Sequence, residues 1–174
     1  MDPENSCQLI IMRHAKSDWT GEYEGDFERP LAKRGGKDAN RMGEWLAEQG
    51  LFPDIIIASP AVRAKQTALI VAEYLKKNEH SIIWDEDIYE AALSDLIRVI
   101  DRHSEGHRRV LIIGHNPGLD KLLCYLSDSE PELTLSGKLL TTSAVAVLEF
   151  NGSQIDTKDH AAKLTMLMRP KQLN

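Results

Sequence analysis

The chain has 174 residues, of which 42% are hydrophobic and 28% are charged, and this is an ordinary composition for a globular protein. Chains of this length usually form one domain with its own core, so we expect a single domain over residues 1–174 and a monomer. The formal net charge of −6 argues against nucleic acid and anionic membranes as partners, because both select basic surfaces.

Three features of the sequence favour the cytoplasm. The first residues, MDPENSCQLIIM, carry acidic side chains where a signal peptide needs basic ones, and their apolar stretch is short. No window approaches the ~18 apolar residues of a membrane span. The two cysteines, Cys7 and Cys124, have no metal-like spacing and are typical of buried thiols in a reducing compartment.

Apolar runs and helical periodicities alternate along the chain. The runs lack polar alternation, as strands do in a sheet covered on both faces, and they predict strands over residues 9–12, 54–58, 81–84 and 110–114. The predicted helices cover residues 37–49, 61–77, 94–103 and 117–126. Ser94 is the expected N-cap of the third helix, and a proline opens the second and the fourth.

The end of the chain follows a different pattern. Residues 144–150 and 163–168 predict two consecutive strands joined by a polar loop. Elsewhere strands and helices alternate, which is typical of a mainly parallel sheet with helices on both faces. The sequence therefore predicts a single three-layer α/β/α domain.

Chemically active side chains follow the predicted strands directly. Arg13 and His14 follow the first apolar run, and His115 follows a later one. Another strand leads into a helix whose first turn carries Arg63. Because ligands of an open α/β sheet bind beyond the carboxyl ends of its strands, we expect these four side chains in one pocket.

Two arginines and two histidines around one concavity suit a dianionic phosphoryl group. A planar guanidinium binds two oxygens at once, and the helix N-terminus near Arg63 also attracts anions. No acidic cluster among these residues can hold a divalent cation, so the arginines supply the positive charge, and we expect neither metal nor cofactor. A neutral imidazole is a competent nucleophile near pH 7, since its ordinary pKa is about 6.5.

Three motifs resemble those of a known family. The segment RHAKSDW is similar to the Arg-His-Gly signature of the histidine phosphatase (phosphoglycerate mutase-like) superfamily, and SPAVRAKQTA and GHNP resemble its second and third motifs. The short chain, the RPLAKRG stretch and the late TTSAVAVLEF segment resemble phosphohistidine phosphatases of the SixA type. The resemblance extends from Leu9 to at least Phe150.

The resemblance implies a role for each motif residue. His14 becomes the expected nucleophile, which carries the phosphoryl group as a covalent intermediate. Arg13, Arg63 and His115 become the expected phosphate ligands. One departure is Ala15, where the signature has glycine, and a methyl group is tolerable there if φ is negative.

The general acid is left open by the sequence. Members of the superfamily that cleave esters usually have a carboxylate after the third strand, and Glu90 lies in that region. An alkoxide leaving group needs a proton, whereas an imidazole leaving a phosphoramidate is less demanding. Glu90 is therefore either a catalytic acid or a carboxylate that lines the pocket.

Together these observations predict a phosphohistidine phosphatase that acts on a phosphorylated protein. The alternative is a phosphatase of small phosphate monoesters that uses Glu90 as its acid. A mutase is disfavoured because the chain of 174 residues lacks the length for the insertions that such enzymes carry. A non-catalytic phosphate-binding module is disfavoured because every expected pocket residue is present.

Overall fold

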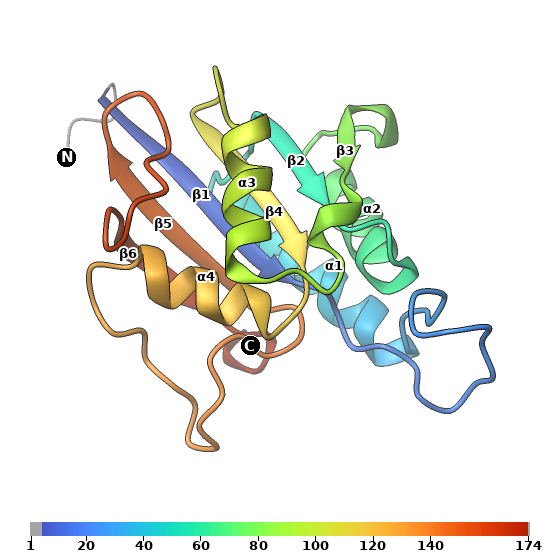
Figure 1. Cartoon of the computed structure of the whole chain (residues 1–174). Coiled ribbons are helices and arrows are strands. Elements are labelled where there is room, and N and C mark those ends of the chain that lie inside the picture. The colour runs from blue at the N-terminus through green and yellow to red at the C-terminus, as the bar shows by residue number, and fades with distance from the viewer. Residues whose placement is uncertain (1–4, 174) are drawn as a thin grey trace.

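The apolar runs pair into one six-stranded sheet in the computed structural model, which describes residues 5–173 (Figure 1). The strands are β1 (Ser6–Arg13), β2 (Ile55–Ala58), β3 (Ile82–Trp84), β4 (Arg109–Gly114), β5 (Val145–Asn151) and β6 (Lys163–Met168). Their order across the sheet is β3-β2-β4-β1-β5-β6. Each predicted strand is present, and the first begins at Ser6 rather than Leu9.

The directions of the strands confirm a mainly parallel sheet. β1, β2, β3 and β4 run parallel, while at one edge β5 pairs antiparallel with β1 and β6 pairs antiparallel with β5. β1 pairs with β4 in a register that sets Arg13 opposite Gly114. The carboxyl ends of β1, β2 and β4 therefore meet at the same end of the sheet.

Helices cover both faces of this sheet, and Figure 1 shows α3 and α4 on the face towards the viewer. The helices are α1 (Lys33–Glu48), α2 (Val62–Tyr74), α3 (Leu93–His103) and α4 (Gly118–Leu126), with 3-10 turns at Glu79–Ser81, Glu86–Ile88 and Pro170–Gln172. Leu9 and Ile11 of β1 pack beneath α3 and α4, whereas Ile10 and Met12 pack beneath α1 and α2. The expected three-layer fold is confirmed. Within residues 5–173, no helix combines the length and the apolar character that crossing a membrane requires.

Several helix boundaries differ from the expectation, and α2 ends at Tyr74 rather than Lys77. α1 begins at Lys33 rather than Lys37, because its first turn has no large apolar side chain to mark the periodicity. The N-cap of α3 is Ala92, so the prediction for Ser94 was wrong. The carboxylate of Asp95, in the first turn of the helix, accepts a hydrogen bond from the N–H of the N-cap residue Ala92 at 2.8 Å.

Gly35, in the first turn of α1, lies directly against the loop that follows β1. A β-carbon on Gly35 would stand 2.1 Å from the carbonyl oxygen of Lys16, far closer than any real contact. Its neighbour Gly36 has nothing within 4 Å of the equivalent position. Gly35 therefore allows α1 to approach the backbone just beyond β1.

Replacing these two glycines by alanine should change stability in opposite directions. Gly36→Ala should raise the free energy of unfolding by up to about 1 kcal/mol, because alanine favours a helix over glycine. Gly35→Ala should lower it by about 1–3 kcal/mol, which is the usual cost of overpacking. Urea unfolding of both variants measures the difference. Similar stabilities for the two variants would contradict the close approach at Gly35.

Candidate active site

The side chains that follow three parallel strands meet at the carboxyl end of the sheet. His14 comes directly after β1, and its backbone N–H donates to the Gly114 carbonyl at the end of β4 at 3.0 Å. His115 follows β4, and its ring centroid lies 5.2 Å from that of His14. Arg63 arrives from the first turn of α2, with its Nε 3.4 Å from His14 Nε2. Together with Arg13, the last residue of β1, these side chains form one cluster.

The two ring nitrogens of His14 have different surroundings. Nδ1 lies 2.7 Å from the carbonyl oxygen of Ala15, which can only accept, so Nδ1 carries the proton and Nε2 keeps its lone pair. Burial, together with the nearby arginines, lowers the pKa of His14 to about 4. The imidazole is therefore neutral near pH 7, and its Nε2 carries the lone pair, which accepts a long hydrogen bond from Arg63 Nε at 3.4 Å.

Thr67 connects the nucleophile loop to the helix that carries Arg63. The Ala15 N–H donates to Thr67 Oγ1 at 3.0 Å, and the same hydroxyl donates to the Arg63 carbonyl at 2.7 Å. Ala15 is fully buried, and its φ lies outside the left-handed region. The methyl group that replaces the glycine hydrogen of the signature is thus accommodated without backbone strain.

Both arginines of the cluster are held by hydrogen bonds that leave donors free. Arg13 donates from Nη1 to the Leu140 carbonyl at 3.0 Å, while its buried Nε has no partner within residues 5–173. Arg63 donates from Nη1 to the Asp26 carbonyl at 2.7 Å and from Nη2 to the Asp26 carboxylate at 2.9 Å. A guanidinium has five N–H donors, so each arginine retains some for an anion.

Ser59 determines which nitrogen of His115 carries the proton. The Ser59 hydroxyl lies 2.7 Å from His115 Nε2 and accepts a hydrogen bond from the Ala61 N–H at 3.2 Å. Because Ser59 is fully buried, its own proton needs an acceptor, and His115 Nε2 is in position to be one. The His115 proton is then on Nδ1, which is buried and has no partner among the described residues. Burial lowers the pKa of His115 to about 3, so this neutral ring offers a free N–H donor.

Asp26 joins Arg63 of the cluster to Arg29, and the sequence motifs did not predict this residue. Its carboxylate accepts hydrogen bonds from Arg29 at 2.6 Å, from Arg63 at 2.9 Å and from the Tyr89 hydroxyl at 2.8 Å. The bond from Arg29, with those from Tyr89 and Arg63, holds the pKa of Asp26 well below its usual range. The one available signal was the i,i+3 spacing to the buried Arg29, since the other partners are remote in sequence.

Glu90 lies at the rim of the cluster. It is exposed, and its φ of 54° falls in the left-handed region. Its carboxylate forms no hydrogen bond or ion pair with the residues that the structure describes. Its neighbour Tyr89 does reach the cluster, because the Tyr89 ring packs edge-on against His115 with 5.5 Å between centroids. The role of Glu90 stays a prediction.

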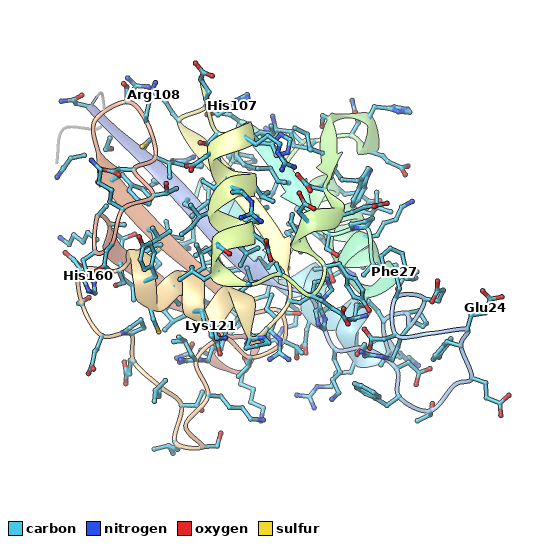
Figure 2. The ribbon with its side chains drawn as sticks, in the orientation of Figure 1. Glu24, Phe27, His107, Arg108, Lys121 and His160 are labelled. Atoms are coloured by element: carbon cyan, nitrogen blue, oxygen red, sulfur yellow. The ribbon has the colours of Figure 1, made fainter. Side chains whose placement is uncertain are left out.

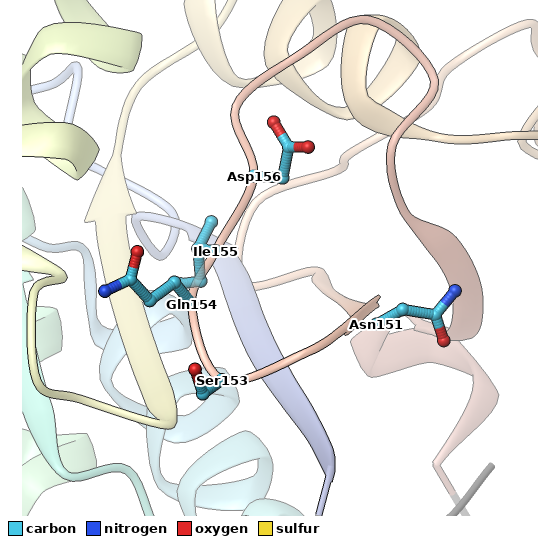
Figure 3. Close-up of a pocket in the computed structure, with 5 residues that line it drawn as sticks. All are labelled: Asn151, Ser153, Gln154, Ile155 and Asp156. Atoms are coloured by element: carbon cyan, nitrogen blue, oxygen red, sulfur yellow. The ribbon is translucent and has the colours of Figure 1, made fainter.

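A hollow of about 370 Å³ lies at the opposite end of β1 from the cluster (Figure 3). Its lining residues are Asn151, Ser153, Gln154, Ile155 and Asp156. Asn151 pairs with Ser6 at the start of β1, whereas His14 follows the end of that strand. None of the lining residues is basic, so this hollow does not suit a phosphoryl group. Across residues 5–173, no three His, Cys, Asp or Glu side chains are grouped so that they can hold a metal ion.

The sequence from residue 9 to residue 97 matches the model of the histidine phosphatase superfamily, branch 1. The chain belongs to this superfamily. The chain is 30% identical over 165 residues to an uncharacterised protein of Mycobacterium tuberculosis, and the match covers 92% of this chain and 100% of the other. An uncharacterised chloroplastic protein of Arabidopsis thaliana is 30% identical over 159 residues, covering 85% of this chain and 69% of its own length.

Solved structures extend the similarity to nearly the whole chain. The protein histidine phosphatase SixA in complex with tungstate is 25% identical, with a TM-score of 0.79 and coverage of 96% of this chain and 99% of that one. A SixA-type structure from Nakamurella multipartitia has the same fold, with 23% identity, a TM-score of 0.79 and coverage of 97% and 99%. The resemblance predicted from the motifs is confirmed, and membership of the family supports a phosphatase activity.

The proton on His115 can be located by ¹⁵N NMR of histidine-labelled protein. Near pH 7 the nitrogen chemical shifts should show a protonated Nδ1 and an unprotonated Nε2. Ser59→Ala removes the hydroxyl that donates to Nε2, so both tautomers should then appear, while Ser59→Thr should keep the wild-type pattern. A wild-type His115 with its proton on Nε2 would contradict the assignment.

Proposed function

We propose that this protein hydrolyses phosphohistidine on a protein substrate, through a covalent intermediate on His14 and without a metal ion. One observation carries the proposal: the buried His14 ring has its Nδ1 2.7 Å from the Ala15 carbonyl oxygen, which leaves the lone pair on Nε2, and Nε2 lies 3.4 Å from Arg63 Nε. The similarity to a structure described as a protein histidine phosphatase supports the same substrate class.

In the first step, His14 Nε2 attacks the phosphorus atom of the substrate. The new P–N bond forms as the bond to the substrate imidazole breaks, and the bond electrons stay on the leaving nitrogen. Negative charge builds on the equatorial oxygens, where Arg13 and Arg63 supply positive donors. The free Nδ1–H of His115 supplies a neutral donor to the same oxygens.

In the second step, water attacks the phosphoryl group carried by His14. The P–Nε2 bond breaks, its electrons return to Nε2, and dihydrogen phosphate leaves. The Ala15 carbonyl keeps the proton on Nδ1 throughout, so the phosphorylated ring is an imidazolium, from which neutral imidazole leaves readily. The neutral His14 is thereby restored for the next turnover.

A second candidate is the hydrolysis of small phosphate monoesters with Glu90 as the general acid. Glu90 adjoins Tyr89, which contacts both His115 and Asp26, so a carboxylic acid stands near the cluster. Its exposed position favours the phosphohistidine substrate instead, because an imidazole leaves without strong acid assistance whereas an alkoxide does not.

Replacement of His14 by alanine should abolish both turnover and covalent labelling. Wild-type protein quenched during reaction with a ³²P-labelled phosphohistidine substrate should retain label that acid releases and alkali preserves, as a P–N bond requires. His80→Ala, which removes an exposed imidazole in a 3-10 turn, is the control and should change neither result. Activity of His14→Ala above a few per cent of wild type would remove His14 as the nucleophile.

Glu90→Gln separates the two candidate substrates. If Glu90 is the acid, hydrolysis of an alkyl phosphate should fall about 10²–10⁴-fold, since glutamine cannot deliver a proton. We expect poor ester turnover in the wild type and little change on phosphohistidine. Glu86→Gln, at an exposed residue of the preceding 3-10 turn, is the matched control. A steep loss confined to the ester would favour the monoesterase, and equal losses on both substrates would assign Glu90 a structural role.

A further inference from the structure

The loop between β1 and α1 surrounds a hollow beside the buried cluster. Its volume is about 270 Å³, and its walls include Asp18, Trp19, Tyr23, Asp26 and Arg29. Asp26 belongs to the cluster as well, because its carboxylate is bonded to Arg63, which contacts the nucleophile. The hollow therefore adjoins the place where a phosphoryl group on His14 would lie.

This loop is anchored on the side of the cluster. The Phe27 ring packs edge-on against Tyr89 with 5.1 Å between centroids, and the Phe27 carbonyl accepts a hydrogen bond from the Val62 N–H at 2.9 Å. Figure 2 shows Glu24 at the outer tip of the loop and Phe27 closer to the helices. The walls of the hollow are thus tied to the start of α2, the helix that carries Arg63.

Trp19 is 70% exposed but is held in one place. The guanidinium carbon of Arg29 lies 3.7 Å from the centroid of the Trp19 ring. Arg29 is itself buried and bonded to Ser17 and Asp26, so it forms a fixed support for the indole. Covering an exposed indole is favourable because it removes apolar surface from water, and the Trp19 ring still has exposed surface that a ligand can cover.

Carboxylates accompany the aromatic rings around the hollow. Asp18 accepts hydrogen bonds from the Thr20 and Tyr23 hydroxyls, each at 2.7 Å, and these bonds lower the pKa of Asp18. Asp26 is shared between Arg29 and Arg63, and Asp18 adds a second carboxylate to the wall of the hollow. Aromatic faces attract cations and carboxylates accept N–H groups, so the hollow suits a flat ring that carries a positive charge.

We infer that this hollow binds the leaving imidazole of the phosphohistidine residue, stacked on Trp19 with its free N–H directed to a carboxylate. The inference rests on the proposed function and locates its leaving group. A phosphohistidine ring protonated on its second nitrogen is a flat cation. When its P–N bond breaks, the electron pair stays on the leaving nitrogen and the ring departs as neutral imidazole. No separate acid is needed, in accord with the exposed position of Glu90.

Trp19→Ala tests the inference with two substrates that share the phosphoryl group. A phosphohistidine peptide contains the ring, whereas phosphoramidate loses only ammonia. The kcat/KM of Trp19→Ala for the peptide should fall about tenfold, as expected for lost stacking and cation–π contacts, and that for phosphoramidate should stay within about twofold. Trp19→Phe should recover most of the activity on the peptide.

Phe52→Ala is the matched control. Phe52 is also an exposed ring beside a cation, with the Lys76 ammonium 5.3 Å from its centroid, but it precedes β2 at the opposite end of the sheet. Its removal should leave both activities unchanged. Equal losses in Trp19→Ala on the two substrates, or no loss on the peptide, would overturn the imidazole subsite and leave the phosphatase proposal intact. Wild-type protein that releases phosphate from neither substrate would overturn both.

Discussion

Parallel pairing of β1 with β4 is the constraint on which the site depends. The register sets Arg13 opposite Gly114, so His14 and His115, the next residues of the two strands, emerge side by side. The Ser143 N–H, which bonds the carbonyls of both Arg13 and His14, fixes the other side of the nucleophile. A slip of one residue would turn every core side chain of β1 to the wrong layer. The spacing of the two imidazoles is therefore as rigid as the sheet.

The same type of side chain has opposite roles within this pair because its partners differ. The Ala15 carbonyl can only accept a hydrogen bond, so His14 has its proton on Nδ1 and its lone pair on Nε2. The Ser59 hydroxyl already accepts a hydrogen bond from the backbone and donates its proton to His115 Nε2, so the N–H of His115 is on Nδ1. Burial keeps both rings neutral by lowering their pKa values to about 4 and about 3. One ring is then suited to attack phosphorus and the other to donate to its oxygens.

Positive charge is concentrated here in a protein whose formal net charge is −6. Two buried arginines, Arg29 and Arg63, share the carboxylate of Asp26, so neither is a buried charge without a counterion. The same carboxylate also fixes the orientation of Arg63, whose Nη1 is held by the backbone of Asp26. Asp26 also lines the hollow beside Trp19, so a single residue belongs both to that hollow and to the hydrogen bonds of Arg63.

Local patterns in the sequence were enough to predict the strands, the layered fold, the family and the four residues of the cluster, because apolar runs and motif residues at strand ends are short-range features. Capping of α3 was mispredicted, since Ser94 has the right chemistry but Asp95 closes the helix from inside its first turn. Glu90 is exposed beside Tyr89, which contacts His115, and its role as an acid stays a prediction. The roles of Asp26 and Ser59 arise from contacts across 37 and 56 residues, to Arg63 and His115. No periodicity or spacing encodes such contacts, because they exist only once the strands and the loop are packed together.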